Sequence, residues 1–237
     1  MKRGHAYVDD VRVNVVIPTL NEKENIADVI FKLRQVGCQK ILIVDGNSTD
    51  GTAETARRLG AEVIVQNGKG KGGALRQAFC EGCFDGDIVM ILDADGSMDP
   101  AEIPSFTQMI ESGADIVKGS RFLPTGQSED MTPMRRVGNT ILTGVLNFIY
   151  FTKYTDLCYG YMAFRKEALK ELAAHLESQN FEIETEICIK AKELGLRIVE
   201  VPSFEHRRRY GASNLRSFKD GFRILSLILR ESLMNGS

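Results

Sequence analysis

Segments with the pattern of buried strands alternate with helical segments through the first half of the chain. The segments 11–18, 40–45 and 88–92 are mostly apolar, and stretches with helical periodicity separate them. Strands that alternate with helices in this way are typical of a mostly parallel sheet that is covered on both faces. We therefore predict an α/β fold with a mostly parallel central sheet and helices on both of its faces.

Polar residues follow the predicted strands at the points where they end. They form the segments PTLNE (18–22), DGNSTD (45–50), DAD (93–95) and KGSR (118–121). The carboxyl ends of parallel strands lie at one edge of a sheet, and open α/β proteins bind their ligands there. We therefore expect these four segments to meet in one crevice.

Asp93 and Asp95 stand directly after the predicted strand 88–92 and are the strongest candidates for chemistry. Two carboxylates at this spacing can hold one Mg²⁺ or Mn²⁺ ion, whose remaining ligands are water and phosphate oxygens. Such an ion stabilises a diphosphate that leaves with growing negative charge. Asp99, which precedes Pro100, is instead predicted to cap the next helix.

Five motifs in the first half of the chain resemble, in order and spacing, those of family 2 glycosyltransferases with the GT-A nucleotide-sugar fold. They are VVIPTLNEKENI, IVDGNSTDGT, GKGGALRQAF, DADGSMDP and IVKGSRF. Three later motifs, YGYMAFRKEAL, FEIETEICIKAKELGLRIVEVP and RRRYGASNLRSFKDG, are similar to the polyprenyl-phosphate branch, typified by dolichyl-phosphate mannose synthase. The resemblance covers roughly residues 12 to 225.

The resemblance implies an inverting, metal-dependent hexosyltransferase that moves mannose or glucose. Its donor would be a nucleotide sugar such as GDP-mannose or UDP-glucose, its acceptor a polyprenyl or dolichyl phosphate, and its cofactor Mg²⁺ or Mn²⁺. Two departures leave the donor nucleotide open. Gly46 stands where the family often has a second aspartate, and Ser97 stands where this branch often has glutamine.

The resemblance also assigns roles to individual residues. The donor would be bound by Pro18, Leu20, Glu22, Asp45, Asp93, Ala94, Asp95 and Arg121. Asp93 and Asp95 would hold the metal. The acceptor phosphate would be bound by Arg135, Arg136, Arg208 and Ser213, with the choice between the two adjacent arginines open. The resemblance thereby implies catalytic roles for four residues, Asp93, Asp95, Arg121 and Arg208.

The chemistry of the acceptor leaves two alternatives. A lipid phosphate is ionised at neutral pH and needs cations to position it, whereas a sugar hydroxyl needs a general base. The basic cluster 207–209 beside the turn 211–214 favours the phosphate. A soluble family member that acts on a hydroxyl would use Glu184 or Glu186 as the base, although Glu186 and Lys190 also have the spacing of a helical ion pair.

Two other classes of protein fit the sequence less well. A nucleotidyltransferase of this fold class is expected to carry a G-x-G-x-R loop after the first strand, where this chain has PTLNEKEN. A non-catalytic module that only binds sugar nucleotides would have no need of the full set Asp93, Asp95, Arg121 and Arg208. The transferase therefore remains the favoured hypothesis.

The last helical segment, 217–233, has an apolar face beside a basic stripe. The apolar face consists of Phe218, Phe222, Leu225, Leu229 and Leu233. Adjoining apolar and basic stripes suit a membrane surface, where long basic side chains reach lipid phosphates. Packing on the core or on a partner subunit, as in a homodimer, is the alternative. The segment 137–151 is open to the same interpretations.

Composition and the chain ends set the remaining expectations. The 237 residues, 43% of them hydrophobic, suit one catalytic domain over 1–237, with a core of about 12–204 and a basic loop plus amphipathic helix over 205–237. A net charge of −2 gives no sign of nucleic-acid binding. We expect a cytoplasmic protein, at most peripheral on the cytoplasmic face of a membrane, since no signal peptide or apolar span is evident. The five cysteines suit reduced thiols.

Overall fold

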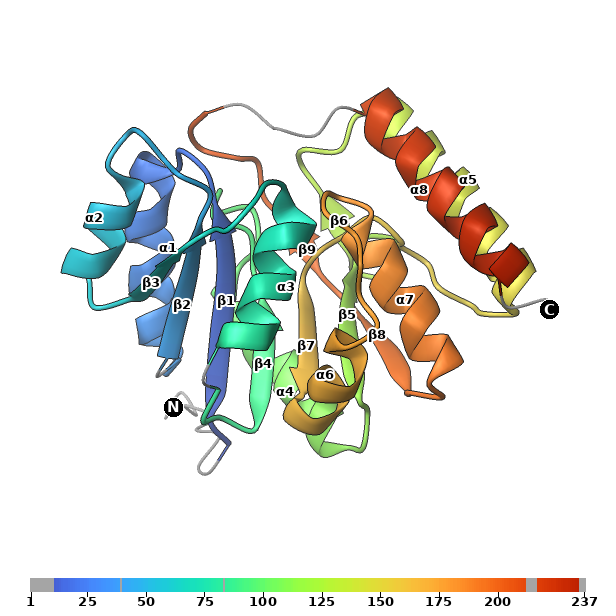
Figure 1. Cartoon of the computed structure of the whole chain (residues 1–237), viewed down its shortest axis with the longest axis horizontal. Helices are drawn as coiled ribbons and strands as arrows, with labels where there is room; N and C mark the ends of the chain where they lie inside the picture. Colours follow the sequence, from blue (N-terminus) through green and yellow to red (C-terminus); the bar gives the residue numbers. More distant parts are fainter. Residues whose placement is uncertain (1–10, 39, 83, 212–216, 235–237) are drawn as a thin grey trace.

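A seven-stranded sheet with helices on both faces forms the body of the protein (Figure 1). The computed structural model describes residues 11–38, 40–82, 84–211 and 217–234. The sheet has the strand order β3-β2-β1-β4-β7-β5-β8. The strands are β1 (Val13–Thr19), β2 (Lys40–Asp45), β3 (Glu62–Val65), β4 (Ile88–Ile91), β5 (Ile116–Ser120), β7 (Met162–Arg165) and β8 (Ile198–Pro202). The strands β6 (Gln127–Ser128) and β9 (Phe204–Glu205) form a separate pair.

Only β7 runs against its neighbours among the described strands of this sheet, pairing antiparallel with β4 and β5. The other pairs are parallel. The sequence prediction of a mostly parallel sheet is therefore confirmed. The helices are α1 (Lys23–Gln35), α2 (Thr52–Arg58), α3 (Lys71–Glu81), α4 (Ile103–Glu111), α5 (Pro133–Tyr150), α6 (Lys166–Ala173), α7 (Ile183–Glu193) and α8 (Ser217–Met234).

Alternate residues of β1 serve two cores because successive side chains of a strand point to opposite faces. Val15 and Ile17 pack with residues of α1 and α4, whereas Val16 packs with residues of α3, α6 and α7. All three side chains are fully buried. The predicted helical cover on both faces is thereby confirmed, and it holds the strand ends in fixed relative positions.

The register of the strands brings their polar ends together. Thr19 at the end of β1 pairs with Asp45 at the end of β2, and Val16 pairs with Ile91 at the end of β4. Asp93 follows β4 within two residues. The carboxyl ends of β1, β2 and β4 therefore lie at one edge of the sheet, as the sequence analysis expected.

The helices α5 and α8 lie side by side beyond α7 (Figure 1). Their apolar side chains form a third cluster with α7, including Leu146, Ile189, Ile224 and Ile228. Helix α5 begins at Pro133, where the side chain of Thr132 accepts a hydrogen bond from the backbone N–H of Arg135. A threonine cap followed by proline is a helix-start signal.

None of the helices within the described ranges is long and apolar enough to cross a membrane.

The start of α3 depends on a close approach to the backbone of residues 178–179. A Cβ on Gly72 would lie 2.5 Å from the carbonyl oxygen of Ser178, whereas a Cβ on Gly73 would meet the side-chain oxygen of Gln179 at 2.9 Å. Backbone cannot move aside as a flexible side chain can. The missing Cβ of Gly72 therefore lets α3 and the chain before α7 come together.

We predict that Gly72→Ala lowers the free energy of unfolding by about 1–3 kcal/mol, because the added methyl overpacks a buried contact. Gly73→Ala is the matched control, and its free energy of unfolding should stay within about 0.5 kcal/mol of wild type because the Gln179 side chain can turn away. Urea denaturation measures both. Equal losses in the two variants would contradict the assigned contact.

Candidate active site

A cavity of about 730 Å³ opens at the carboxyl ends of the strands and continues to α5 and α8. Nine of the predicted site residues line it, namely Pro18, Leu20, Glu22, Asp93, Ala94, Asp95, Arg121, Arg135 and Arg208. Asp45 and Arg136 are not among its lining residues, and Ser213 lies outside the described residues. The predicted crevice therefore exists, and most of the predicted residues meet in it.

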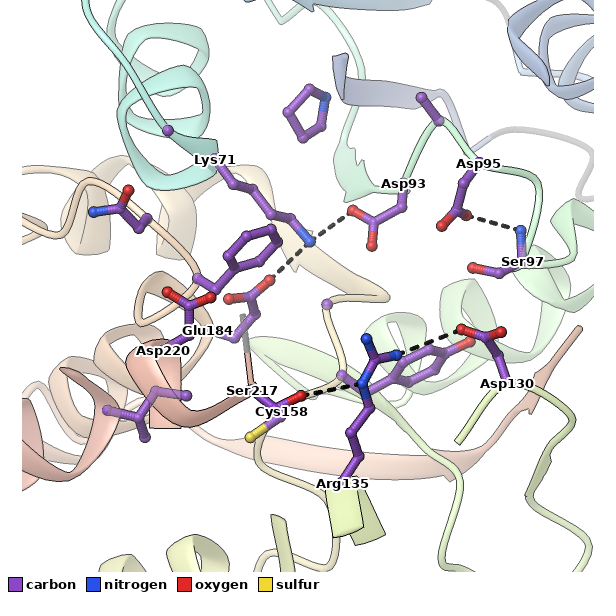
Figure 2. A pocket seen from close by; sticks show the side chains of 18 of the residues that line it. Lys71, Asp93, Asp95, Ser97, Asp130, Arg135, Cys158, Glu184, Ser217 and Asp220 are labelled. Atoms are coloured by element: carbon purple, nitrogen blue, oxygen red, sulfur yellow. Dashed lines mark hydrogen bonds and ion pairs between the residues drawn. The ribbon is translucent and has the colours of Figure 1, made fainter. Parts of the chain in front are cut away.

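Lys71 joins two carboxylates that are far apart in the sequence. Its Nζ lies 2.6 Å from Asp93 Oδ1 and 2.8 Å from Glu184 Oε1, as Figure 2 shows. Burial alone would lower the pKa of Lys71, but attraction to Asp93 and Glu184 outweighs it and holds the pKa above its ordinary value. Lys71 is therefore a permanent cation in the wall of the cavity.

Arg208 makes a second bridge of the same kind. Its guanidinium lies 2.9 Å from Asp95 Oδ2 and 2.7 Å from Glu22 Oε1. Burial opposes the charged form, but Asp95 and Glu22 raise the pKa of Arg208 above its ordinary value. The backbone N–H of Ser97 donates to the other oxygen of Asp95 at 3.0 Å. Asp95 is thus held from two sides at the cavity.

Asp99 does not take part in these bridges. Its Oδ1 accepts a hydrogen bond from the backbone N–H of Ala101 at 3.0 Å, at the start of the 3₁₀ turn 100–102. The prediction that Asp99 caps the next helical turn is confirmed.

Arg121 is anchored in the cavity wall by two carboxylates. It donates to both oxygens of Asp156, at 2.7 and 3.0 Å, and to both oxygens of Glu205, at 3.1 Å. Burial would lower its pKa, but Asp156 and Glu205 raise it above the ordinary value. All three guanidinium nitrogens are therefore bound within the protein, and the predicted contact of Arg121 with phosphate oxygens stays a prediction.

The structure separates the two adjacent arginines that the sequence left undecided. Arg135 lines the cavity, with its Nε 3.4 Å from Ser217 Oγ and its guanidinium 3.7 Å from Asp130. Arg136 lies over the ring of Phe122, 5.3 Å from the ring centre. Of the two, Arg135 is the one placed to meet a ligand in the cavity.

A second hollow of about 490 Å³ adjoins this part of the site. Arg135, Arg207 and Arg208 line it together with the hydroxyl-bearing Ser217 and Thr132. Both Arg135 and Arg208 also line the main cavity. The two hollows therefore share a boundary at which these two arginines outnumber one carboxylate, Asp130.

The two candidate bases occupy different places. Glu184 lines the cavity and is bound to Lys71. Glu186 is fully buried and accepts hydrogen bonds from the backbone N–H groups of Glu177 and Ser178, at 3.0 and 2.9 Å. The structure thus gives Glu186 a structural contact, which removes it as a candidate base.

The suggested helical ion pair between Glu186 and Lys190 is wrong. Lys190 binds Glu231 of α8 at 2.6 Å and Glu193 at 3.0 Å instead. It thereby connects α7 to α8.

The site can now be compared with known proteins. Residues 14–173 match the Glycosyl transferase family 2 profile. The chain belongs to glycosyltransferase family 2. This glycosyltransferase is 36% identical to glycosyltransferase AglJ of Haloferax volcanii over 94% of its own length and 73% of the relative's. It is 31% identical to a dolichyl-phosphate hexose transferase of the same organism, with 92% and 93% covered.

The fold has a solved counterpart. Glucosyl-3-phosphoglycerate synthase of Mycobacterium tuberculosis, in complex with Mn²⁺, UDP and glucosyl-3-phosphoglycerate, superposes with a TM-score of 0.72 at 22% identity, over 94% of this chain and 80% of that one. The expected GT-A fold and the expected hexosyltransferase class are therefore confirmed for this family member.

The glycosyltransferase has a charge excess at its site that suits a divalent cation. The ion-paired residues, called the carboxylate network below, are Glu22, Lys71, Asp93, Asp95, Glu184 and Arg208. Four carboxylates face two cations in it, which leaves two negative charges. Within the described ranges no group of three or more His, Cys, Asp or Glu side chains is arranged to hold a metal. A Mg²⁺ or Mn²⁺ ion fits at Asp93 and Asp95 if donor phosphates and water complete its ligands.

Lys71 of the glycosyltransferase was not among the site residues predicted from the sequence, and the choice between Glu184 and Glu186 was open at that level. Lys71 lies in GKGKGG, where two lysines stand two residues apart with no local pattern to distinguish them. The glycines on either side of Lys71 were the available sequence signal, because repeated glycines often mark a close approach of two backbone segments. In the structure, Gly70 and Gly72 both lie against the backbone of residues 178–179, just before α7.

We predict that Asp156→Asn lowers the free energy of unfolding of the glycosyltransferase by about 3–5 kcal/mol at neutral pH, because it removes the more buried of the two carboxylates that pair with the buried Arg121. Burial would raise the pKa of Asp156, but Arg121 holds it below the ordinary value. The contribution of Asp156 is therefore complete above about pH 4 and is lost as the pH falls further. Urea denaturation at several pH values should show the wild type converging on the variant in acid.

Asp28→Asn is the matched control, since Asp28 makes its ion pairs with Lys32 and Arg209 at the surface. That variant should lose less than about 1 kcal/mol. A loss for Asp156→Asn no greater than for Asp28→Asn would contradict the role given to the Arg121–Asp156 pair.

Proposed function

We propose that this glycosyltransferase moves a hexose from a nucleoside diphosphate sugar to a polyprenyl phosphate at a membrane surface. The observation that carries the proposal is the composition of the cavity lining. The carboxylate network, Arg135 and apolar residues of α5 and α8 line one continuous cavity, and Arg135 and Arg208 also line the adjoining hollow. A charged donor, an acceptor phosphate and a hydrocarbon chain match these three kinds of lining.

The donor would lie over the ends of β1, β2 and β4. Pro18, Leu20 and Ala94 line this part of the cavity. Thr19 Oγ1 and Asp45 Oδ1 are buried and have no hydrogen-bond partner among the described residues, although they stand in register on adjacent strands. Unpaired buried polar atoms are costly. Nucleoside groups would satisfy them, and this supports Asp45 as a donor-binding residue beside the wall of the cavity.

The leaving group would be met by the carboxylate network. A Mg²⁺ or Mn²⁺ ion at Asp93 and Asp95 would supply positive charge to the departing diphosphate. Lys71 holds Asp93 at the cavity (Figure 2). Arg208 holds Asp95 in the same way. Both cations belong to the network and line the cavity, so they would also contribute to binding the phosphates.

The acceptor phosphate would bind at the boundary formed by Arg135 and Arg208. One of its oxygens forms the bond to the anomeric carbon while the bond from that carbon to the diphosphate breaks, and the nucleoside diphosphate leaves with the electron pair. Attack from the side opposite the leaving group inverts the configuration. A phosphate monoester is already ionised, so this step needs no base. In this scheme Glu184 is not a base, and its role is to hold Lys71 in place through their ion pair.

The membrane surface would be contacted by exposed apolar residues of α5 and α8. This lipid-facing surface consists of Val137, Ile141, Phe148, Phe151, Phe222, Leu229, Leu233 and Met234. The rings of Phe148 and Phe151 are 83% and 88% exposed, which is unusual for phenylalanine unless a partner covers it. Exposed basic residues, including Arg136 and Lys219, lie on the same helices. Apolar residues flanked by basic ones favour an anionic lipid surface.

We predict transfer from GDP-mannose or UDP-glucose to farnesyl phosphate in the presence of Mn²⁺ or Mg²⁺, and little transfer to free hydroxyl acceptors. A panel of nucleotide sugars, each assayed with farnesyl phosphate and with simple sugars, measures this directly. Removal of the metal by EDTA should stop transfer, because the leaving diphosphate then keeps its full charge. Transfer to hydroxyl acceptors alone would overturn the lipid-phosphate proposal and favour Glu184 as a base.

The control for this panel is Asp95→Asn, which removes one carboxylate charge and keeps the shape. We expect it to lower the transfer rate at least about a hundredfold, a loss of the size that follows removal of one transition-state interaction. Circular dichroism should show an unchanged fold. Retained activity would mean that the metal assignment is wrong.

We predict that the wild type sediments with vesicles of phosphatidylcholine and phosphatidylglycerol, and that the double variant Phe148→Ser with Phe222→Ser binds at least about tenfold more weakly. Each ring buried in lipid contributes roughly 1.5–3 kcal/mol, and 1.4 kcal/mol corresponds to a factor of ten. Phe31→Ser, at an exposed site on α1, is the control and should bind like wild type. The proposal is contradicted if the wild type does not sediment with vesicles but forms dimers, and the double variant is monomeric. This surface would then be a subunit contact.

A further inference from the structure

The part of the cavity lined by α5 and α8 differs from the carboxylate network. Its residues without polar side chains are three of α5, spaced four apart, and three of α8, spaced three apart. These spacings place each trio on one side of its helix. The six residues are Met134, Gly138, Leu142, Phe218, Gly221 and Ile224. We call this part of the cavity the α5–α8 slot.

A glycine stands at the middle of each trio. A Cβ added to Gly138 or to Gly221 would meet no atom within 4 Å. Glycine within a helix costs stability relative to alanine, and the usual structural reason for it is close approach of another group. That reason does not apply at either position. The two glycines instead leave open space in the slot, because any larger residue at these positions would place its side chain there.

The proposal that follows rests on the proposed function. We infer that the α5–α8 slot binds the isoprene units next to the phosphate of the acceptor, and that Gly138 and Gly221 determine which acceptors enter. Arg135 lies one turn of helix before Gly138 and lines the same cavity, so a phosphate bound there would direct its hydrocarbon along α5. The slot selects a branched hydrocarbon because the missing side chains make room for its methyl groups.

The lining of the slot excludes the other parts of the reactants. Met134, Leu142, Phe218 and Ile224 offer no hydrogen bond to a sugar or a nucleoside. The neighbouring polar side chains of the two helices have partners within the protein: Asn139 donates to Asp156, Ser217 accepts from Arg135, and Asp220 is bound to Arg223 at 3.0 Å. Met134 and Phe218 are 50% and 81% exposed at the outer end, so the slot opens where the lipid-facing surface begins. A hydrocarbon chain is the occupant whose chemistry matches both features.

The test fills the slot without touching the carboxylate network. In Gly138→Leu and Gly221→Leu the new side chain occupies open space, so the helices should form at least as well as in wild type. We expect both variants to lose at least tenfold in transfer to farnesyl phosphate and to bind nucleoside diphosphate with Mn²⁺ as tightly as wild type. Gly138→Ala should keep most of the activity, because the loss should follow side-chain volume.

Gly144→Leu is the matched control. Gly144 lies in the same helix, is exposed, would also accept a Cβ without contact, and lies outside the cavity lining. Its transfer to farnesyl phosphate should equal that of wild type. The inference is overturned if Gly138→Leu and Gly221→Leu transfer sugar to farnesyl phosphate at the wild-type rate. It is also overturned if Gly144→Leu loses as much of this transfer as they do.

A direct binding measurement separates this inference from the proposed function. Calorimetric titration with farnesyl phosphate should show binding to wild type and binding at least tenfold weaker to Gly138→Leu. If wild type transfers sugar to no polyprenyl phosphate but still binds farnesyl phosphate in a Gly138-dependent way, the proposed function fails and the slot stands. If wild type does not bind farnesyl phosphate, the slot is overturned.

Discussion

The site depends on the balance of charge where the strand ends converge. Parallel strands place their carboxyl ends at one edge, and this chain brings four carboxylates there from distant parts of its sequence. Lys71 and Arg208 each bind two of them, and both cations keep a raised pKa. Without them, like charges would repel across a partly buried space. The fold of α3, α7 and the segment after β9 around the sheet is therefore tied to these two side chains.

The same balance connects the site to its surroundings. Arg208 contacts Asp95 and also lines the second hollow, so a change at the carboxylates directly affects a residue of that hollow. Arg121, by contrast, donates its hydrogen bonds to Asp156 and Glu205 within the protein. One arginine thus faces ligand space, while the other joins β5, β9 and the chain before β7. Sequence motifs gave the two equal weight, and only their partners distinguish them.

Local patterns predicted what depends on neighbouring residues, and failed where distant contacts decide. The apolar strands with polar ends and the cap at Asp99 followed from local patterns set by backbone geometry, whereas the GT-A fold was implied by the resemblance of the motifs to family 2 glycosyltransferases. Glu184 and Glu186 are two apart on one helix and point to different sides, so choosing between them required the positions of α3 and the chain before α7. Lys190 likewise pairs with Glu231 of α8, a partner that helical spacing could not indicate.

The last helix shows why amphipathicity alone was ambiguous. Ile224, Leu227 and Ile228 of α8 pack into the chain, while Phe218 and Phe222 on another side stay exposed. A helix that is apolar on two sides can pack on the core with one side and meet a second surface with the other. Core packing and a membrane contact are therefore not exclusive alternatives for α8. The inner contact anchors α8 to α5 and α7, and the outer one is free to meet lipid. A cavity between these helices and the sheet would then place the acceptor phosphate at the depth of the lipid head groups, where a donor from water and an acceptor from the membrane can meet.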